Sequence, residues 1–149
     1  MDQYIVFVNK EQKFAINVSK VERILEYKEP KRLPDSSPYF LGVIQYNGSI
    51  LPIIDLTKRL YDADMAVTMD TKIVVVNWKE RLLGLVVDDI IGIQSFTDKQ
   101  FEEFDLDIEI SSEYIIGFIK SHGDIIVCLD IDRVFDQEQE DELILATNE

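Results

Sequence analysis

The chain contains one unit of sequence twice. Residues 41–60 read LGVIQYNGSILPIIDLTKRL and residues 116–135 read IGFIKSHGDIIVCLDIDRVF, and the two align without a gap. Gly48 of the first unit falls on Gly123 of the second. An Asn-Gly pair between two apolar runs indicates a β-hairpin, because a type I′ turn needs positive φ at both central positions. The duplication therefore predicts two hairpins of the same design, and it restricts the fold to two similar halves.

Each unit carries an aspartate at the same place, Asp55 in the first and Asp130 in the second. A carboxylate there can accept hydrogen bonds from the unpaired backbone N–H groups that open a helix. We therefore predict that both aspartates cap a short helix, and that Gly48 and Gly123 maintain the turns. A small hydrolase that uses Asp55, Asp88 or Asp130 for acid–base chemistry stays as an alternative.

The rest of the chain follows the same repeat. YIVFV and FAINV, within residues 4–18, read as two strands, and KIVVVNWKERLLGLVV, from residue 72, repeats their order. About ten short strands with few helices indicate an all-β chain. Two such copies favour two similar five-stranded barrels packed together, since closure or a partner must cover the strand edges.

The repeat also sets the expected boundaries. We predict a first barrel over 1–65, a second over 70–136, and an acidic tail over 137–149 that extends the helix begun at Asp130. An exchange of strands between the barrels is left open. Pro52 lies within a predicted strand and lacks a backbone donor, so that strand is expected at a sheet edge or at a bend.

The charge balance excludes several classes of partner. The chain has 149 residues, a net charge of −14 and 46% hydrophobic residues, which suffices for one domain or for two small ones with a shared core. Such an acidic surface repels nucleic acid and anionic lipid. No apolar run reaches the roughly 18–20 residues of a membrane helix, and the first residues show no signal-peptide pattern. We therefore expect a cytoplasmic protein without direct membrane insertion.

Residue types that carry catalysis are few. The single histidine, His122, lies in a predicted turn without a nucleophile pattern nearby, and the single cysteine, Cys128, lies within an apolar strand. Asp88 and Asp89 adjoin, but no metal-ligand spacing follows them in the sequence. Glycine-rich phosphate loops are missing from the sequence as well. The residues therefore indicate a binding module, with no catalytic residues, metal or cofactor expected.

Four segments of the chain resemble CheW, the coupling-protein family of bacterial chemotaxis. They read YIVFVNKEQKFAINVSKVERIL, LGVIQYNGSILPIIDLTKRL, KIVVVNWKERLLGLVVDDIIGI and SEYIIGFIKSHGDIIVCLDIDRVF, in the family's order. The resemblance covers nearly the whole chain. It implies one CheW-like domain over 1–149, made of two Src-homology-3-like barrels with an apolar seam between them.

The resemblance also implies a function and a set of contact residues. It implies a non-enzymatic adaptor that bridges the cytoplasmic tip of methyl-accepting chemoreceptors to the regulatory domain of the histidine kinase CheA, at receptor arrays beneath the inner membrane. By resemblance, Val18 and Val21 fall at the kinase contact. Val21, Ile93, Arg23 and Asn47 fall at the receptor contact. The alternatives are an adaptor of a non-flagellar pathway, for pilus motility or development, and the hydrolase named above.

Two positions depart from the family pattern. The family has Arg before the hairpin glycine, in N-L-R-G, where this chain has Asn47. The family often has Glu at the position of Arg23, which Glu22 precedes here. Asparagine cannot replace the charge and the bidentate donors of arginine. We therefore interpret the chain as a divergent coupling protein, in which an ion pair usual in the family is absent or rebuilt.

Overall fold

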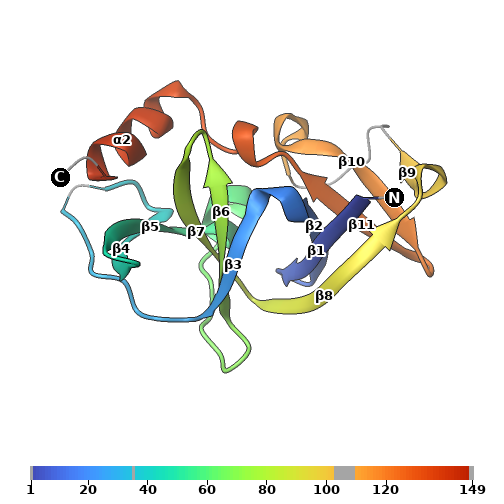
Figure 1. Ribbon diagram of the computed structural model, residues 1–149, viewed down its shortest axis with the longest axis horizontal. Helices are drawn as coiled ribbons and strands as arrows, with labels where there is room; N and C mark the ends of the chain where they lie inside the picture. The colour runs from blue at the N-terminus through green and yellow to red at the C-terminus, as the bar shows by residue number, and fades with distance from the viewer. Residues whose placement is uncertain (1, 35, 103–109, 148–149) are drawn as a thin grey trace.

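Two β-sheets make up the fold (Figure 1), a computed structural model that describes residues 2–34, 36–102 and 110–147. The six-stranded sheet has the order β8 (Asp89–Phe96), β1 (Asp2–Asn9), β2 (Gln12–Asn17), β11 (Asp124–Leu129), β10 (Ile115–Ser121) and β9 (Phe101–Glu102). The five-stranded sheet has the order β3 (Val21–Glu26), β6 (Lys72–Trp78), β7 (Arg81–Val87), β5 (Ser49–Asp55) and β4 (Phe40–Tyr46). In Figure 1 the five-stranded sheet lies to the left and the six-stranded sheet to the right. The predicted all-β class is confirmed.

Each sheet takes strands from both halves of the chain. The β1–β2 hairpin of the first half lies in the six-stranded sheet, where β2 runs parallel to β11. The β6–β7 hairpin of the second half lies in the five-stranded sheet, where β7 runs parallel to β5. The boundaries of the sequence repeats, 1–65 and 70–136, therefore do not coincide with those of the sheets, and neither half supplies a complete sheet.

Both faces of the central strands, such as β5, β6 and β7, are buried, which explains their continuous apolar runs. One face of the five-stranded sheet covers a small core of its own, and alternate residues point to a larger core that both sheets share. This shared core is called the seam core below. The core of the five-stranded sheet contains Ile44, Tyr46, Leu51, Ile53, Ile73, Val75 and Val86. The core of the six-stranded sheet contains Val6, Ala15, Phe96, Ile119, Ile126 and Cys128. The seam core includes Phe7, Phe14, Ile54, Val74, Val76, Trp78, Leu85, Phe118, Val127, Leu129 and Phe135.

The two repeated hairpins turn as the Asn-Gly pattern predicts. Asn47 and Gly48 have φ of 48° and 79°, and His122 and Gly123 have φ of 50° and 83°. Positive φ at both central residues is the mark of a type I′ turn. The β1–β2 and β6–β7 turns also have positive φ at both central residues, although neither contains a glycine. The buried strands beside these turns therefore override the preference of such turns for Asn and Gly.

Short helices follow the second strand of each hairpin. Helix α1 (Leu56–Tyr61) begins at Asp55, whose Oδ1 accepts a hydrogen bond from the backbone N–H of Lys58 at 3.0 Å. The 3₁₀-helix η4 (Ile131–Arg133) begins at Asp130, which accepts from the backbone N–H of Asp132 at 3.1 Å. Both carboxylates therefore occupy the N-cap position of a helix.

The chain after η4 does not extend that helix, contrary to the sequence-based expectation for the tail. A separate helix, α2 (Gln137–Thr147), packs on the five-stranded sheet and buries Leu143. The backbone N–H and the hydroxyl of Ser37 donate to the Glu142 carboxylate at 2.7 and 2.6 Å. These tertiary contacts order a segment whose composition alone indicates an acidic tail. In the described part of the chain, no helix has the length and apolar character needed to span a membrane.

Candidate functional site

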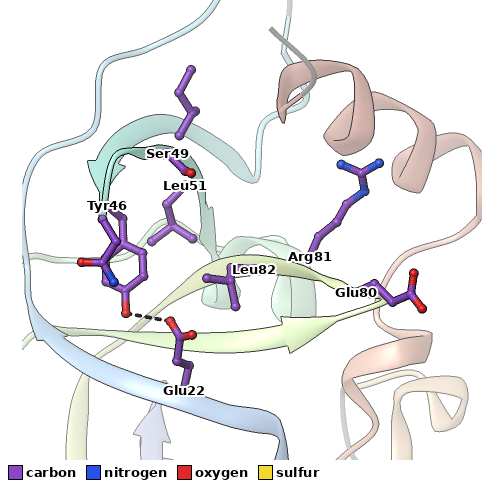
Figure 2. A pocket seen from close by; sticks show the side chains of 9 residues that line it. Glu22, Tyr46, Ser49, Leu51, Glu80, Arg81 and Leu82 are labelled. Carbon is purple, nitrogen blue, oxygen red and sulfur yellow. Dashed lines mark hydrogen bonds between the residues drawn. The ribbon is translucent and has the colours of Figure 1, made fainter.

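A groove of about 460 Å³ opens at the end of the five-stranded sheet, where two turns come together. It is called the hairpin groove here. Its lining comes from β3, from the β4–β5 hairpin tip and from the β6–β7 turn: Glu22, Tyr46, Asn47, Ser49, Ile50, Leu51, Glu80, Arg81 and Leu82. Figure 2 shows Tyr46 turned toward Glu22, with Leu51 and Leu82 between this pair and the side formed by Glu80 and Arg81. The groove therefore has an apolar centre and polar sides.

A hydrogen bond links β3 to the hairpin across this groove. The Tyr46 hydroxyl donates to Glu22 Oε2 at 2.7 Å, and the Arg23 guanidinium carbon lies 6.0 Å from the centroid of the Tyr46 ring. The hydrogen bond to the Glu22 carboxylate raises the pKa of Tyr46, and burial adds to the shift. In this chain, Glu22 and Tyr46 thus form the link between β3, which carries Arg23, and the β4–β5 hairpin.

Asn47 lies exposed at the hairpin tip and lines the groove. The order of the strands brings it near Glu22, because β3 and β4 are opposite edges of one sheet that curls over its own small core. Of the predicted receptor-contact residues, Asn47 therefore lines this groove, and Arg23 lies beside it, next to the Tyr46 ring. Glu22, Tyr46 and Glu80 were missed, since the pairing that assembles them leaves no local signal in the sequence.

The other predicted contact residues lie elsewhere, along the seam core. Val18 and Val21 flank the junction of β2 and β3, are partly buried, and pack against the seam core. Ile93 lies on the edge strand β8 opposite Ile5, and its side chain is 61% exposed. Since Ile5 belongs to the seam core, Ile93 extends the apolar face of that core to the surface of the molecule. The predicted contacts thus fall into two groups, one at the groove and one at the seam.

The aspartates of the hydrolase alternative are held in structural contacts. Asp55 is buried and caps α1, and this burial raises the pKa of its carboxyl. Asp88 Oδ2 accepts a hydrogen bond from the backbone N–H of Lys10 at 2.9 Å, and Asp130 caps η4. Among residues 2–34, 36–102 and 110–147, no three His, Cys, Asp or Glu side chains are grouped as metal ligands would be. These carboxylates therefore stabilise turns and helix ends.

The thiol of Cys128 is buried in the core of the six-stranded sheet. Burial raises its pKa from 9.0 to about 12, and the neighbouring Asp130 carboxylate adds to the shift. Because only the thiolate is a good nucleophile, we expect no reaction with a disulfide reagent at about pH 8 in the folded protein and full reaction in denaturant. Because folding raises this pKa, the buried neutral thiol makes its full contribution to the free energy of unfolding below about pH 9. This contribution is lost as the pH rises towards about 12. Rapid labelling of the folded protein would contradict the buried position.

The comparison with known proteins places these features in a family. The model of the CheW-like domain matches residues 3–139. The chain belongs to the CheW-like domain family. The chemotaxis protein CheW of Bacillus subtilis is 30% identical over 141 residues, with 92% of this chain and 88% of that relative covered. CheW of Rhizobium meliloti is 28% identical over 138 residues, with 92% and 89% covered. The predicted family and the predicted role of a CheW-like coupling protein in chemotaxis are confirmed.

A solved structure shares the CheW-like fold. The scaffolding protein TtCheW of Thermoanaerobacter tengcongensis superposes with a TM-score of 0.85 at 20% sequence identity, covering 93% of this chain and 90% of that one. At this identity the likeness concerns the fold, which is preserved although four residues in five differ. The predicted CheW-like fold is therefore confirmed.

Proposed function

We propose that this CheW-like chain couples the cytoplasmic tip of methyl-accepting chemoreceptors to the regulatory domain of the histidine kinase CheA. The observation that carries the proposal is the match of the CheW-like domain to residues 3–139, together with a chemotaxis relative 30% identical over almost its whole length. An adaptor of this kind transmits the receptor state by binding and needs no chemistry of its own. We therefore also assign it a non-enzymatic role.

The seam supports a contact with receptor helices. A helix that docks in a groove does so through a stripe of apolar side chains. Ile93 offers such a side chain on the edge strand β8, opposite Ile5 of the seam core, and Val21 lies partly exposed against the same core. We assign Val21 and Ile93 to the receptor contact on this ground.

The kinase contact is assigned to the junction of β2 and β3. Val18 lies in the 3₁₀-helix η1 (Val18–Lys20), and Asn17 caps this helix by accepting from the backbone N–H of Ser19 at 2.9 Å. A capped, ordered turn presents Val18 in one conformation, which lowers the entropic cost of binding. Val21, directly after the turn, belongs to both assigned contacts.

The charge of the chain fits a role at receptor arrays. A net charge of −14 limits non-specific association with nucleic acid and with anionic lipid. We therefore place the protein in the cytoplasm, where its partners would hold it beneath the inner membrane.

A binding experiment tests the proposal. Immobilised chain should retain both the CheA regulatory domain and a receptor-tip fragment of the same organism, each without the other. Sedimentation or calorimetry should show that each partner forms a single complex with the chain. The proposal fails if neither partner is retained.

The second candidate is an adaptor of a non-flagellar chemosensory pathway. The departures at Arg23 and Asn47 favour it, because they change the charge around the hairpin groove relative to the family pattern. Co-purification from native cells, with identification of the retained receptors by mass spectrometry, separates the two. Recovery of receptors and kinase of the flagellar pathway alone excludes this candidate.

A further inference from the structure

The hairpin groove is a preformed site with an apolar floor. Leu51 is fully buried and Leu82 is half-buried, and both belong to the small core of the five-stranded sheet, whereas Ile50, between Ser49 and Leu51, is 39% exposed at the rim. Two-residue turns border it on both sides, and Lys79 and Glu80 hold φ of 47° and 65° without glycine. Positive φ in such residues is uncommon and persists where the surroundings dictate it. The rim is therefore fixed before any ligand arrives.

The polar groups of the groove are mainly acceptors with negative charge. Glu22 and Glu80 line it together with one cation, Arg81, and Arg23 lies beside the Tyr46 ring, on a chain with a net charge of −14. The Tyr46 hydroxyl occupies only Oε2 of Glu22. A carboxylate can accept several hydrogen bonds, so Glu22 keeps capacity for a donor from outside. Tyr46 thus fixes the direction of a carboxylate at the edge of an apolar floor.

From this arrangement we infer that the hairpin groove binds a lysine or arginine side chain of a partner protein. The aliphatic stem would lie on Leu82, and the cation would meet Glu22, with Glu80 adding to the negative field. Tyr46 acts as a positioning residue, because it touches the recognition group and holds its orientation. Which partner carries this side chain rests on the proposed adaptor function, whereas the binding of the side chain does not.

The test uses the whole chain and three capped tripeptides, with lysine, norleucine or glutamate between two leucines. In two-dimensional ¹⁵N NMR titrations at millimolar peptide, the lysine peptide should shift the amides of Tyr46, Asn47 and Leu82. The norleucine peptide should shift them less, and the glutamate peptide should leave them unmoved. Equal shifts by all three peptides, or shifts away from the groove, would overturn the inference. So would a shift of the same amides on concentrating the chain alone, because the groove would then belong to a second copy.

Matched variants separate charge from shape. Glu22→Gln keeps an acceptor for the Tyr46 hydroxyl and removes the charge, and it should weaken the lysine peptide about tenfold. Glu26→Gln removes the same charge from the same strand outside the groove and should change nothing. Glu80→Gln should weaken binding less, and its control is Glu11→Gln, which lies in the equivalent turn with φ of 64°.

Tyr46→Phe distinguishes a positioning role from packing. It retains the ring and the charges but releases Glu22, and it should weaken the lysine peptide about threefold while lowering the melting temperature by no more than about 5 °C. Tyr46→Phe with the affinity of the wild type would remove Tyr46 from the inference. If the receptor tip and CheA bind the chain while the peptides and Glu22→Gln have no effect, the inference fails and the adaptor function stands. If the peptides bind as expected while neither protein does, the adaptor function fails, but the inferred binding of a basic side chain in the groove holds.

Discussion

Replacing Ile93 by glutamate is expected to lower the affinity for the receptor tip about 30-fold, because a central apolar contact is worth about 2 kcal/mol or more at an interface. The side chain is 61% exposed on the edge strand β8, so the charge stays solvated in the unbound chain. The melting temperature should therefore change by no more than about 2 °C. Isothermal calorimetry and a thermal scan measure the two quantities.

Ile116→Glu provides the matched control. Ile116 is an isoleucine of the same sheet, 48% exposed on β10, and it belongs to neither predicted contact. Its variant should bind the receptor tip like the wild type. Equal losses in both variants would indicate a general effect of charge and would contradict the assignment of Ile93. A charge at Val21, by contrast, should lower both affinity and stability, because Val21 packs against the seam core.

Replacing Phe14 by alanine is expected to lower the free energy of unfolding by about 3–5 kcal/mol. Phe14 is fully buried in the seam core, its ring stacks on Phe7 with centroids 5.7 Å apart, and Tyr61 of α1 meets it edge-on at 6.4 Å. Its strand β2 also forms the parallel pair with β11, where Phe14 lies opposite Val127. The loss therefore affects the sheet, the helix and the seam together.

Urea unfolding followed by fluorescence and circular dichroism measures this loss. Because the two sheets share strands and the seam core, both signals should report one transition in the wild type and in the variant. Leu145→Ala, at a side chain 71% exposed on α2, is the control and should change the free energy by less than about 0.5 kcal/mol. A loss below about 1 kcal/mol for Phe14→Ala, or two separate transitions, would contradict a shared seam.

The fold was predictable where the signal was local. Asn47-Gly48 predicted its hairpin and Asp55 its helix, because the turn and the cap each depend on residues adjacent in the sequence. The β6–β7 turn was less distinct, since Lys79 and Glu80 adopt the same turn without the favoured residue types. There the register of buried strands decides the geometry.

Pro52 shows how a local rule is met in a non-local setting. Its missing donor predicted an edge or a bend, and the edge is wrong, because β5 lies inside the sheet between β7 and β4. The opposite residue, Val43, directs its N–H and its carbonyl to Lys31 at 2.9 Å, away from β5. On the other side, the pairing of β5 with β7 begins only at Ile53. Neither neighbouring strand would accept a hydrogen bond from residue 52, so the missing N–H of Pro52 costs no hydrogen bond. The sequence alone does not indicate this pairing.

The candidate site was predictable in part for the same reason. The resemblance selected Arg23 and Asn47 one by one, but only the order of the strands brings them to one groove with Glu22 and Tyr46. Helix α2 is a further case, because single contacts such as Ser37 with Glu142 order it and its composition does not.

The proposed function is the coupling of receptor state to kinase activity. The rate of CheA autophosphorylation on membranes that contain the chemoreceptor, with and without the chain, measures this coupling. We expect the rate to rise when all three are present and to fall when attractant is added. We expect the Ile93→Glu chain to restore little of the increase. An unchanged rate on adding the wild-type chain, with folded kinase and receptor confirmed, would contradict the coupling role.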